Sequence, residues 1–412
     1  MINVLAKLII NEHQVPMFGK IDDDNRRIEL YCQMTDLPAG VLGQDQYFYG
    51  KSFTISLIDT EAKAYSLYGV WFSQMQMAIT GPGVMTLRGT FNRLIREKQP
   101  NQEYQYASFT FHEIEKLFPI DQFETHHTEK ELIFEKKIKD PVEQQLNDSL
   151  CCDVQSTLIG TVEGDLFNLD LLQTQRIWLR SNVRRTVDEW TEIIDKVKAY
   201  LEFVLNQEIG VEDVILGQAE RHSGSTARLI ADPILIPKSY LKEVKDNPYR
   251  GTSEELLSGL AGWYQGFDEY QRAIEIWQKT IYNLNVSAED LFLWRAQAFE
   301  LLCTINQEIH NKAVSLRAEK QAFPNLKNNL IAAIDELGLG NIDEAYYSDA
   351  KNVRDYFTHN NPDKEVDDRQ KKNSYKLMDH YLRKSMAVIF GVKGLSYAFW
   401  LEPPTEGNNN SK

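Results

Sequence analysis

Residues Val353–Pro362 read VRDYFTHNNP and lie in the last quarter of a 412-residue chain, in a region whose apolar spacing is typical of packed helices. Proline disfavours the α conformation in the residue before it, so this helix is expected to end by about Asn361. His359 then lies in the last turn or just beyond it. A side chain at such a position can leave the helical bundle and contact a substrate or a partner subunit.

The spacing within this stretch separates an arginine from a histidine. On a helix of about 3.6 residues per turn, Arg354 and His359 lie roughly 140° apart and do not share a face. Asp355 and His359 do share one, as do Arg354 and Thr358. A carboxylate one turn from an imidazole can hold one ring nitrogen and favour the charged form of the ring. The arginine is a permanent cation with a planar fork of donors that suits phosphate.

The run from Arg354 to His359 resembles the R-x4-6-H signature of HEPN domains, whose second residue is usually polar, as Asp355 is. The surrounding region, with Ala298-Phe299-Glu300 in an earlier long helix, is similar to the ApeA-like branch of that family. The N-terminal half resembles the β-rich domain that precedes HEPN in this branch, so the resemblance spans nearly the whole chain. It implies a nuclease of bacterial defence against phage, held inactive until infection and then cleaving RNA, for which tRNA is the expected substrate.

The resemblance also implies a mechanism that needs no metal and no cofactor. The ribose 2′-hydroxyl attacks its own 3′ phosphate, with His359 as general base and Arg354 as the cation for the phosphorane charge. Asp355 would set the tautomer and orientation of His359. HEPN proteins pair these motifs across a two-fold dimer, so a homodimer or a higher even oligomer is expected. A site shared between two copies would also bring an Arg354 and a His359 together, although the two residues lie on different faces of their helix.

Substrate contacts are expected from five residues around the motif: Thr358, Asn360, Lys351, Lys371 and Lys372. The formal net charge of -15 argues against broad binding of nucleic acid, because phosphate contacts dominate that affinity. A local basic cluster is available: Lys351, Arg369, Lys371, Lys372, Lys376, Arg383 and Lys384. The alternative interpretation of this cluster is a solvated helix face. Glu300 can face the motif helix in this fold, but a solvated glutamate is the simpler interpretation.

Composition places the chain among ordinary globular proteins, with 42% hydrophobic and 25% charged residues and a length sufficient for two domains. Because no apolar run approaches the roughly 18 residues of a bilayer span, we expect no membrane segment. The start of the chain resembles no signal peptide. Four cysteines do not make a disulfide framework at this length. A cytoplasmic location is therefore expected.

The predicted fold class is α+β, with a β-rich, sandwich-like domain over residues 1–236. Polar and apolar residues alternate in Ser52–Leu57, and further strands are predicted up to about residue 180. A helix then starts at a capping box, Thr186–Glu189, and a short β return follows around Val211–Leu216 and Ala227–Ile236. Residues 237–251 are the predicted linker. This first domain would sense a phage-derived trigger.

Residues 252–402 predict an all-α bundle of five helices, and residues 403–412 a disordered tail. The helices are expected over 253–282, from Ser287 to about Lys320, over Leu326–Leu337, from Ile342 into the motif, and over Arg369–Phe390. Phe323-Pro324 and the run from Gly338 to Asn341 separate three of them.

Other candidate sites are weaker in the sequence. His126-His127 and the loop from Arg221 to Ser225 are better interpreted as solvated or flexible connections. Asp22–Asp24 and Asp367-Asp368 offer carboxylates for a divalent ion, but neither has calcium-loop spacing. Two alternative functions stay open: a non-catalytic HEPN-type binding protein, antitoxin-like or a scaffold, and a glycan- or peptide-binding β-sandwich with a helical dimerisation domain. In the first of these, Arg354 would simply bond helix carbonyls or an acidic neighbour.

Overall fold

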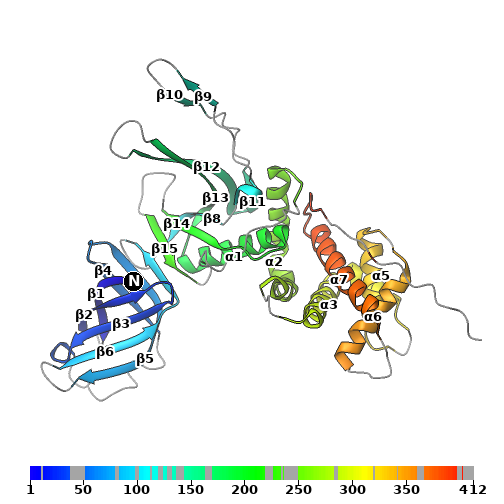
Figure 1. Ribbon diagram of the computed structural model, residues 1–412, viewed down its shortest axis with the longest axis horizontal. Helices are drawn as coiled ribbons and strands as arrows, with labels where there is room; N and C mark the ends of the chain where they lie inside the picture. The colour runs from blue at the N-terminus through cyan, green and yellow to red at the C-terminus, as the bar shows by residue number, and fades with distance from the viewer. Residues whose placement is uncertain are drawn as a thin grey trace, which may run out of the picture. The chain divides into compact units, whose positions relative to one another are not determined.

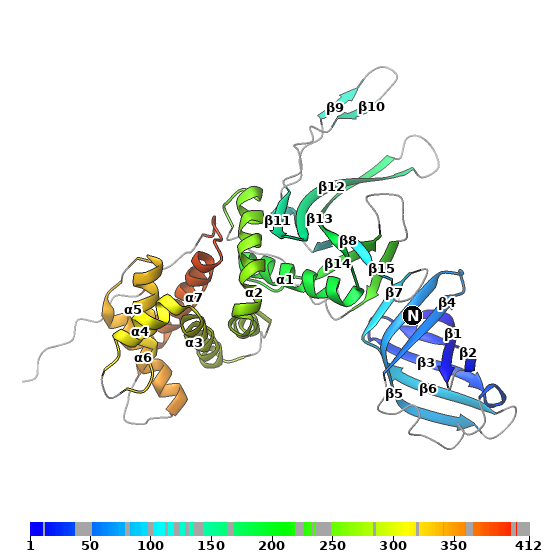
Figure 2. The ribbon, with the colours of Figure 1, turned by 180° about the vertical axis from the view of Figure 1, so that it is seen from behind.

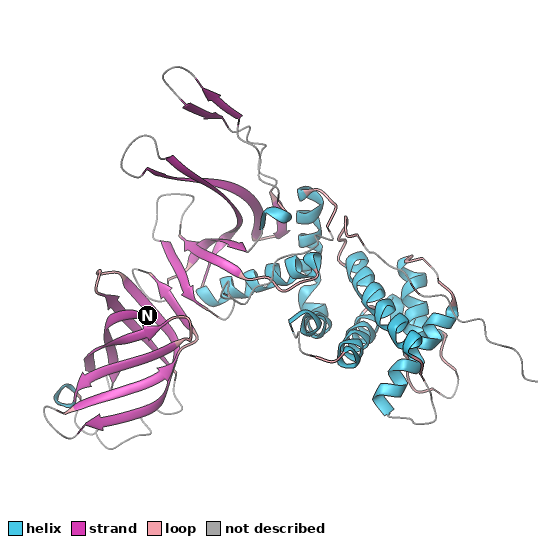
Figure 3. Cartoon of the chain, viewed as in Figure 1, coloured by secondary structure: helices cyan, strands magenta, loops and turns pink. Residues whose placement is uncertain are grey.

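The computed structural model describes these residues: 1–10, 13–37, 52–78, 83–97, 102–111, 114–118, 124–127, 132–135, 143–162, 169–218, 226–232, 235, 249–282, 286–318, 321–340, 342–359, 366–396 and 401. The chain forms two compact units, Met1–Asp195 with Ile209–Glu243, and Lys196–Glu208 with Val244–Lys412. The first is rich in strands and the second is helical, as Figures 1 and 3 show. The predicted α+β class, with a β-rich part before a helical part, is confirmed.

Six antiparallel strands of the first unit close into a small barrel. Around it the order is β5-β4-β1-β2-β3-β6, and β6 pairs back onto β5. The bounds are β1 Ile2–Ile10, β2 His13–Asp22, β3 Arg27–Gln33, β4 Phe53–Asp59, β5 Ala64–Ala78 and β6 Val84–Thr90. Buried and accessible residues alternate along β3, so that Ile28, Leu30 and Cys32 point into the barrel core.

The sheet continues out of the barrel because β5 changes partner along one edge. Tyr65–Tyr68 pair with β7, Arg93–Arg96, whereas Trp71–Ala78 pair with β6. Gly69 lies between these two stretches with a φ of 62°, a conformation that glycine adopts without a steric penalty. The predicted sandwich-like arrangement therefore differs from the observed one, since the strands close on themselves where two packed sheets were expected.

Beyond β7 the sheet runs in the order β15-β14-β8-β13-β12-β11. These strands are β8 Tyr104–Phe111, β11 Gln144–Asn147, β12 Leu150–Val162, β13 Leu169–Arg185, β14 Val211–Gly217 and β15 Thr226–Ala231. A separate hairpin joins β9 Glu124–His127 to β10 Leu132–Glu135, and two short 3-10 turns span Met34–Asp36 and Ile114–Lys116. The predicted β return is observed as β14 and β15.

Helix α1, Val187–Leu205, begins at the predicted capping box. The Glu189 amide donates to Thr186 Oγ1 at 3.3 Å, and the Thr186 amide donates to Glu189 Oε2 at 2.7 Å. Trp190 is fully buried, and its indole nitrogen donates to the Tyr104 carbonyl at 3.0 Å. The helix contributes to both units, because its residues from Lys196 onward group with the helical one. The predicted domain 1–236 assigned all of α1 to the β-rich part, and most of the predicted linker lies outside the described residues.

The helical unit contains α2 Ser253–Tyr282, α3 Ala288–Ile305, α4 Gln307–Ser315, α5 Leu326–Leu337, α6 Glu344–His359 and α7 Asp368–Ile389 (Figure 2). Its core is aromatic: Trp263, Trp277, Phe292, Phe299 and Tyr381 are almost completely buried. The predicted bounds of α2 and α5 match the structure. Helix α5 ends at Gly338, as expected, and the φ of 62° at this glycine makes a left-handed cap.

One helix of the prediction is wrong. The expected single helix from Ser287 to about Lys320 is two helices, α3 and α4, which meet at Asn306. The Asn306 side chain accepts a hydrogen bond from the Ile309 amide at 3.2 Å, and its backbone (φ -72°, ψ 109°) is extended. An asparagine side chain that bonds the backbone competes with helix continuation, and here it starts a new helix. The described part of residues 252–402 thus has six helices where five were expected.

Candidate functional site

Helix α6 carries the motif from the core of the helical unit to its surface. Ala350 and Val353 are fully buried, whereas Thr358 and His359, at the C-terminal end, are exposed. Helix α7 packs beside α6, and the two lie side by side in Figures 1 and 2. The predicted exposure of His359 in the last helical turn is therefore confirmed.

Arg354 is held between α6 and α3. Its Nη2 lies 3.4 Å from Glu300 Oε2, and its Nη1 lies 3.5 Å from Asp355 Oδ1. About a third of the Arg354 side chain stays exposed (32%), so part of its donor fork faces solvent. Glu300, which was not among the predicted site residues, contacts this guanidinium from α3, and Asp355 contacts it from α6 itself.

Glu300 lies in a partly desolvated position on α3, with its side chain 24% exposed. Burial raises the pKa of its carboxyl, because a charged carboxylate is poorly solvated there. The Arg354 guanidinium acts in the opposite direction and stabilises the charged form, while Asp355 reinforces the rise. The pKa of the Glu300 carboxyl therefore depends on its contact with Arg354.

Asp355 contacts cations on its own helix. Lys351 Nζ lies 2.9 Å from Asp355 Oδ2, and the other carboxylate oxygen faces Arg354. Both Asp355 and His359 are described, and no hydrogen bond joins them. The predicted support of the imidazole by Asp355 is thus not what this arrangement provides. The carboxylate instead links Lys351 to Arg354 along one face of α6.

Of the predicted substrate contacts, Lys371 lies against the motif. Its Nζ lies 5.5 Å from the ring centroid of Tyr356 and 5.8 Å from that of Phe357, which joins α7 to the end of α6. Lys372 is exposed on α7, and Thr358 donates to the Arg354 carbonyl at 2.8 Å. Asn360 lies outside the described residues.

The predicted basic cluster does not form a single cationic surface. Arg383 is buried and its Nη2 donates to the Phe203 carbonyl at 3.5 Å, while Lys384 donates to the Leu339 carbonyl. Both cations are used in holding the bundle together. Among the described residues, the other cations of the predicted cluster are Lys351, which pairs with Asp355, and those in the first turns of α7.

A buried ionic cluster escaped the sequence analysis. Glu202 on α1 is fully buried and accepts hydrogen bonds from Lys198 and from the Tyr282 hydroxyl, the latter at 2.5 Å. Gln278 Nε2 donates to the same carboxylate at 3.0 Å. Burial raises the pKa of Glu202, and Lys198 opposes that rise. The sequence signal was a Lys and a Glu four residues apart among the otherwise apolar residues 197–205 of α1.

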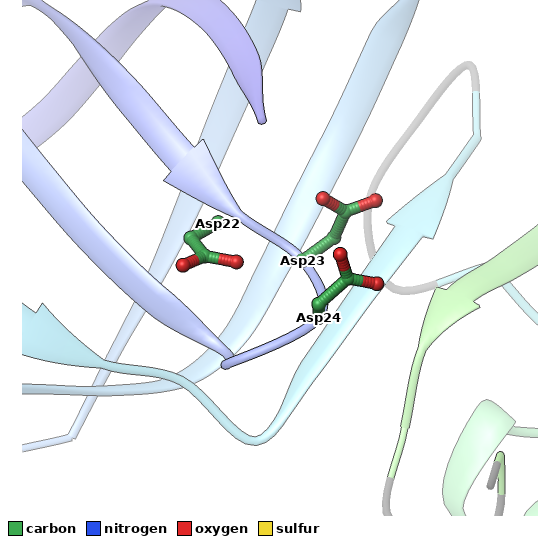
Figure 4. A group of neighbouring side chains, drawn as sticks. All are labelled: Asp22, Asp23 and Asp24. Atoms are coloured by element: carbon green, nitrogen blue, oxygen red, sulfur yellow. The ribbon is translucent and has the colours of Figure 1, made fainter. Parts of the chain in front are cut away.

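The remaining sequence candidates gain little support. Three carboxylates gather where β2 turns toward β3, at Asp22, Asp23 and Asp24 (Figure 4). Asp22 already accepts two hydrogen bonds from Asn25, at 3.1 and 2.8 Å. His126 and His127 are neighbours on β9, and the loop 221–225 lies outside the described residues. Asp367 is the N-cap of α7, a structural role.

Comparison with known proteins identifies no relative: no protein-family model, no curated protein and no solved structure matches this chain. Among the helices of the described residues, none has the length and apolar content required to cross a membrane. The function must therefore be argued from the residues of the chain itself.

Proposed function

We propose that this chain is a cytoplasmic, metal-independent endoribonuclease of the HEPN type, which cuts RNA, with tRNA as the expected substrate, in abortive-infection defence against phage. The observation that supports this proposal is the end of α6. There an exposed imidazole, His359, and a part-exposed guanidinium, Arg354, lie on one helix within a helical unit. The carboxylate of Glu300 accepts a hydrogen bond from that guanidinium at 3.4 Å.

The proposed reaction is an internal transfer of the phosphodiester. The 2′-hydroxyl of a ribose loses its proton to the imidazole of His359 and attacks the adjacent phosphorus. The bond to the 5′ oxygen of the next nucleotide breaks, and that oxygen takes up a proton from water. The products are a 2′,3′-cyclic phosphate and a 5′-hydroxyl. Arg354 stabilises the negative charge that builds up on the non-bridging oxygens.

The two groups would act together across a two-fold axis. Because Arg354 and His359 are five positions apart on α6, their side chains leave the helix roughly 140° apart. One copy of the chain therefore presents them in different directions. A second copy, related by two-fold symmetry, can place its His359 beside the first copy's Arg354. We propose a homodimer, or a higher even oligomer, whose sites are shared between copies.

The test is RNA cleavage by the full-length chain in the presence of EDTA, with the 5′ ends of the products identified. His359→Ala and Arg354→Ala are each expected to reduce the cleavage rate by about 10²-fold or more. His310→Ala, a histidine on α4, is the matched control and should cleave like the wild type. A DNA substrate of the same sequence should stay intact, because it lacks the attacking hydroxyl.

Equal cleavage by the wild type and by both motif variants would exclude this assignment. Loss of cleavage in EDTA would instead indicate a metal-dependent nuclease. The measurement should be made on cells that express the chain, before and during phage infection, as well as on the purified protein, because the proposed enzyme is inactive until a phage-derived trigger acts on its N-terminal unit.

One observation favours a second candidate, a non-catalytic HEPN-type binding protein. Arg354 is flanked by two carboxylates, Glu300 and Asp355, so a large part of its charge is balanced within the chain. The net charge of -15 also opposes binding to RNA. In this case the chain would bind a protein partner through the helical unit. Stable co-purification of a partner that depends on Arg354, with no RNA cleavage, would support it.

A further inference from the structure

A cavity of about 510 Å³ lies within the first unit, beside the point where the sheet leaves the barrel. Its walls come from the turn between β4 and β5, the end of β7, and the hairpin of β14 and β15. The polar side chains lining it are Lys63, Arg96, Glu97 and Arg228. The volume falls within the roughly 300–1,000 Å³ that is usual for small-molecule sites.

The two arginines of the lining lie opposite each other on neighbouring strands. Arg96 of β7 and Arg228 of β15 are direct cross-strand partners in the antiparallel ladder. Like charges directly opposite one another destabilise a strand pair, so this pairing is unfavourable for the fold. The Arg228 Nη2 atom contacts Asp213 Oδ1 at 2.5 Å, which offsets part of the repulsion.

Arg96 differs from Arg228 in this respect. Its side chain is exposed, and it forms no ion pair or hydrogen bond with any residue that the structure describes. Lys63, another cation of the lining, is paired with Glu61. Arg96 thus lies at a cavity wall beside a second cation and, within the described part of the chain, without a carboxylate partner, an arrangement that an anionic ligand would stabilise.

The acidic residue of the cavity does not neutralise Arg96. Glu97 is 4% exposed, and its carboxylate accepts hydrogen bonds from the Tyr68 hydroxyl at 2.6 Å and the Tyr104 hydroxyl at 2.8 Å. Its hydrogen-bonding capacity is therefore largely used by tyrosines. Of the three cationic side chains in the lining, Lys63 and Arg228 pair with the carboxylates of Glu61 and Asp213, and Arg96 pairs with no carboxylate among the described residues, so Arg96 carries the unbalanced positive charge.

From this geometry we propose that the cavity binds a small phosphate monoester. A phosphate monoester carries a charge of about -1.5 to -2 at pH 7, which complements the cationic lining. The planar donor forks of Arg96 and Arg228 suit its oxygens. Ala64, Ala227 and Ile215 provide an apolar wall for the organic part of the ligand. This proposal concerns the first unit and is independent of the proposed nuclease chemistry.

Isothermal titration of the full-length chain tests the proposal with ribose 5-phosphate and AMP, each compared with its neutral counterpart, ribose or adenosine. The phosphorylated ligands should bind and the neutral ones should not. Arg96→Ala and Arg228→Ala should each weaken binding by about tenfold or more, since each removes charge-assisted hydrogen bonds. Arg184→Ala, an exposed arginine on β13, is the control and should leave the affinity unchanged.

A substitution that should strengthen binding provides a second test. Glu97→Gln keeps an oxygen acceptor for the tyrosines but removes a negative charge from the cavity wall, so it should tighten binding of both phosphate esters. Circular dichroism confirms that each variant is folded. The proposal is overturned if neither phosphate ester binds, if ribose and adenosine bind as well as the esters do, or if Arg96→Ala and Arg184→Ala have the same affinity.

Discussion

Arg354 Nη2 lies 3.4 Å from Glu300 Oε2, and this pair joins α6 to α3 beside the exposed end of the motif helix. The two residues are 54 positions apart in the chain. Neither is fully buried, so the pair is partly solvated and its main effect is to orient the guanidinium. Glu300 is thus proposed as a positioning residue, which acts on the substrate only through Arg354.

Removing the Glu300 side chain should slow RNA cleavage without abolishing it. Glu300→Ala releases the Arg354 guanidinium from its orientation, and a displacement of about 1 Å can cost about 10²-fold in rate. We expect kcat to fall between about 10- and 100-fold, with little change in KM. Glu300→Gln keeps an oxygen that accepts from Arg354 and should restore most of the rate. Equal rates for Glu300→Ala and the wild type would exclude the positioning role.

The same carboxyl should affect stability as pH changes. Because burial raises the pKa of Glu300 in the folded state, its contribution is complete below the unfolded value and is lost as pH rises through the folded value. The midpoint of thermal unfolding of the wild type, compared with that of Glu300→Gln, should therefore fall as pH rises above about 4.5. A constant difference between the two proteins at all pH values would contradict this.

Mixing two inactive variants tests whether the site is shared between copies. If each site takes Arg354 from one copy and His359 from the other, a heterodimer of Arg354→Ala and His359→Ala contains one intact site. Co-refolding equal amounts, so that half of the dimers are mixed, should restore about a quarter of wild-type cleavage. Each variant refolded alone is the control. If the mixture stays as inactive as its components, the site is not divided in this way.

Removing one partner of the buried Lys198–Glu202 pair should lower the free energy of unfolding strongly, whereas replacing both partners with apolar residues should change it little. Glu202→Ala leaves the Lys198 ammonium buried without its carboxylate, a change that usually costs about 3–5 kcal/mol. The double variant Lys198→Met with Glu202→Leu removes both charges and should come within about 1 kcal/mol of the wild type. Denaturant unfolding followed by circular dichroism measures both. A double variant less stable than Glu202→Ala would show that the ion pair itself stabilises the bundle.

His380 on α7 should make the chain sensitive to acid. Burial lowers its pKa from 6.5 to about 4, and the neighbouring Lys384 and Arg383 act in the same direction against the opposing effect of Asp379. Since the folded value is depressed, stability is complete above pH 6.5 and is lost as pH falls toward 4. The loss should be about 2 kcal/mol after allowance for partial exposure of the ring. It should disappear in His380→Gln but persist in His310→Gln.

Local signals in the sequence located most of the helices. The capping box at Thr186 is observed where it was predicted, and the predicted helix start at Ser287 and helix stop at Gly338 are observed as an N-cap and a left-handed cap. Each of these signals acts between residues at most five positions apart, so the local sequence is sufficient to set where the helix begins or ends. The break at Asn306 was missed because an asparagine within a helical pattern is compatible with either outcome until its side chain bonds the backbone.

The sequence by itself determined the α+β class, the order of a strand-rich part and a helical part, and the exposed position of His359 before a proline. Tertiary structure alone decided that the strands close into a barrel, that Glu300 contacts Arg354, and that Arg96 lies opposite Arg228. The physical reason is the separation along the chain between the residues that interact. Helix ends and strand alternation follow from neighbours a few residues away, whereas ladder partners and ion pairs between helices exist only after distant segments have packed together.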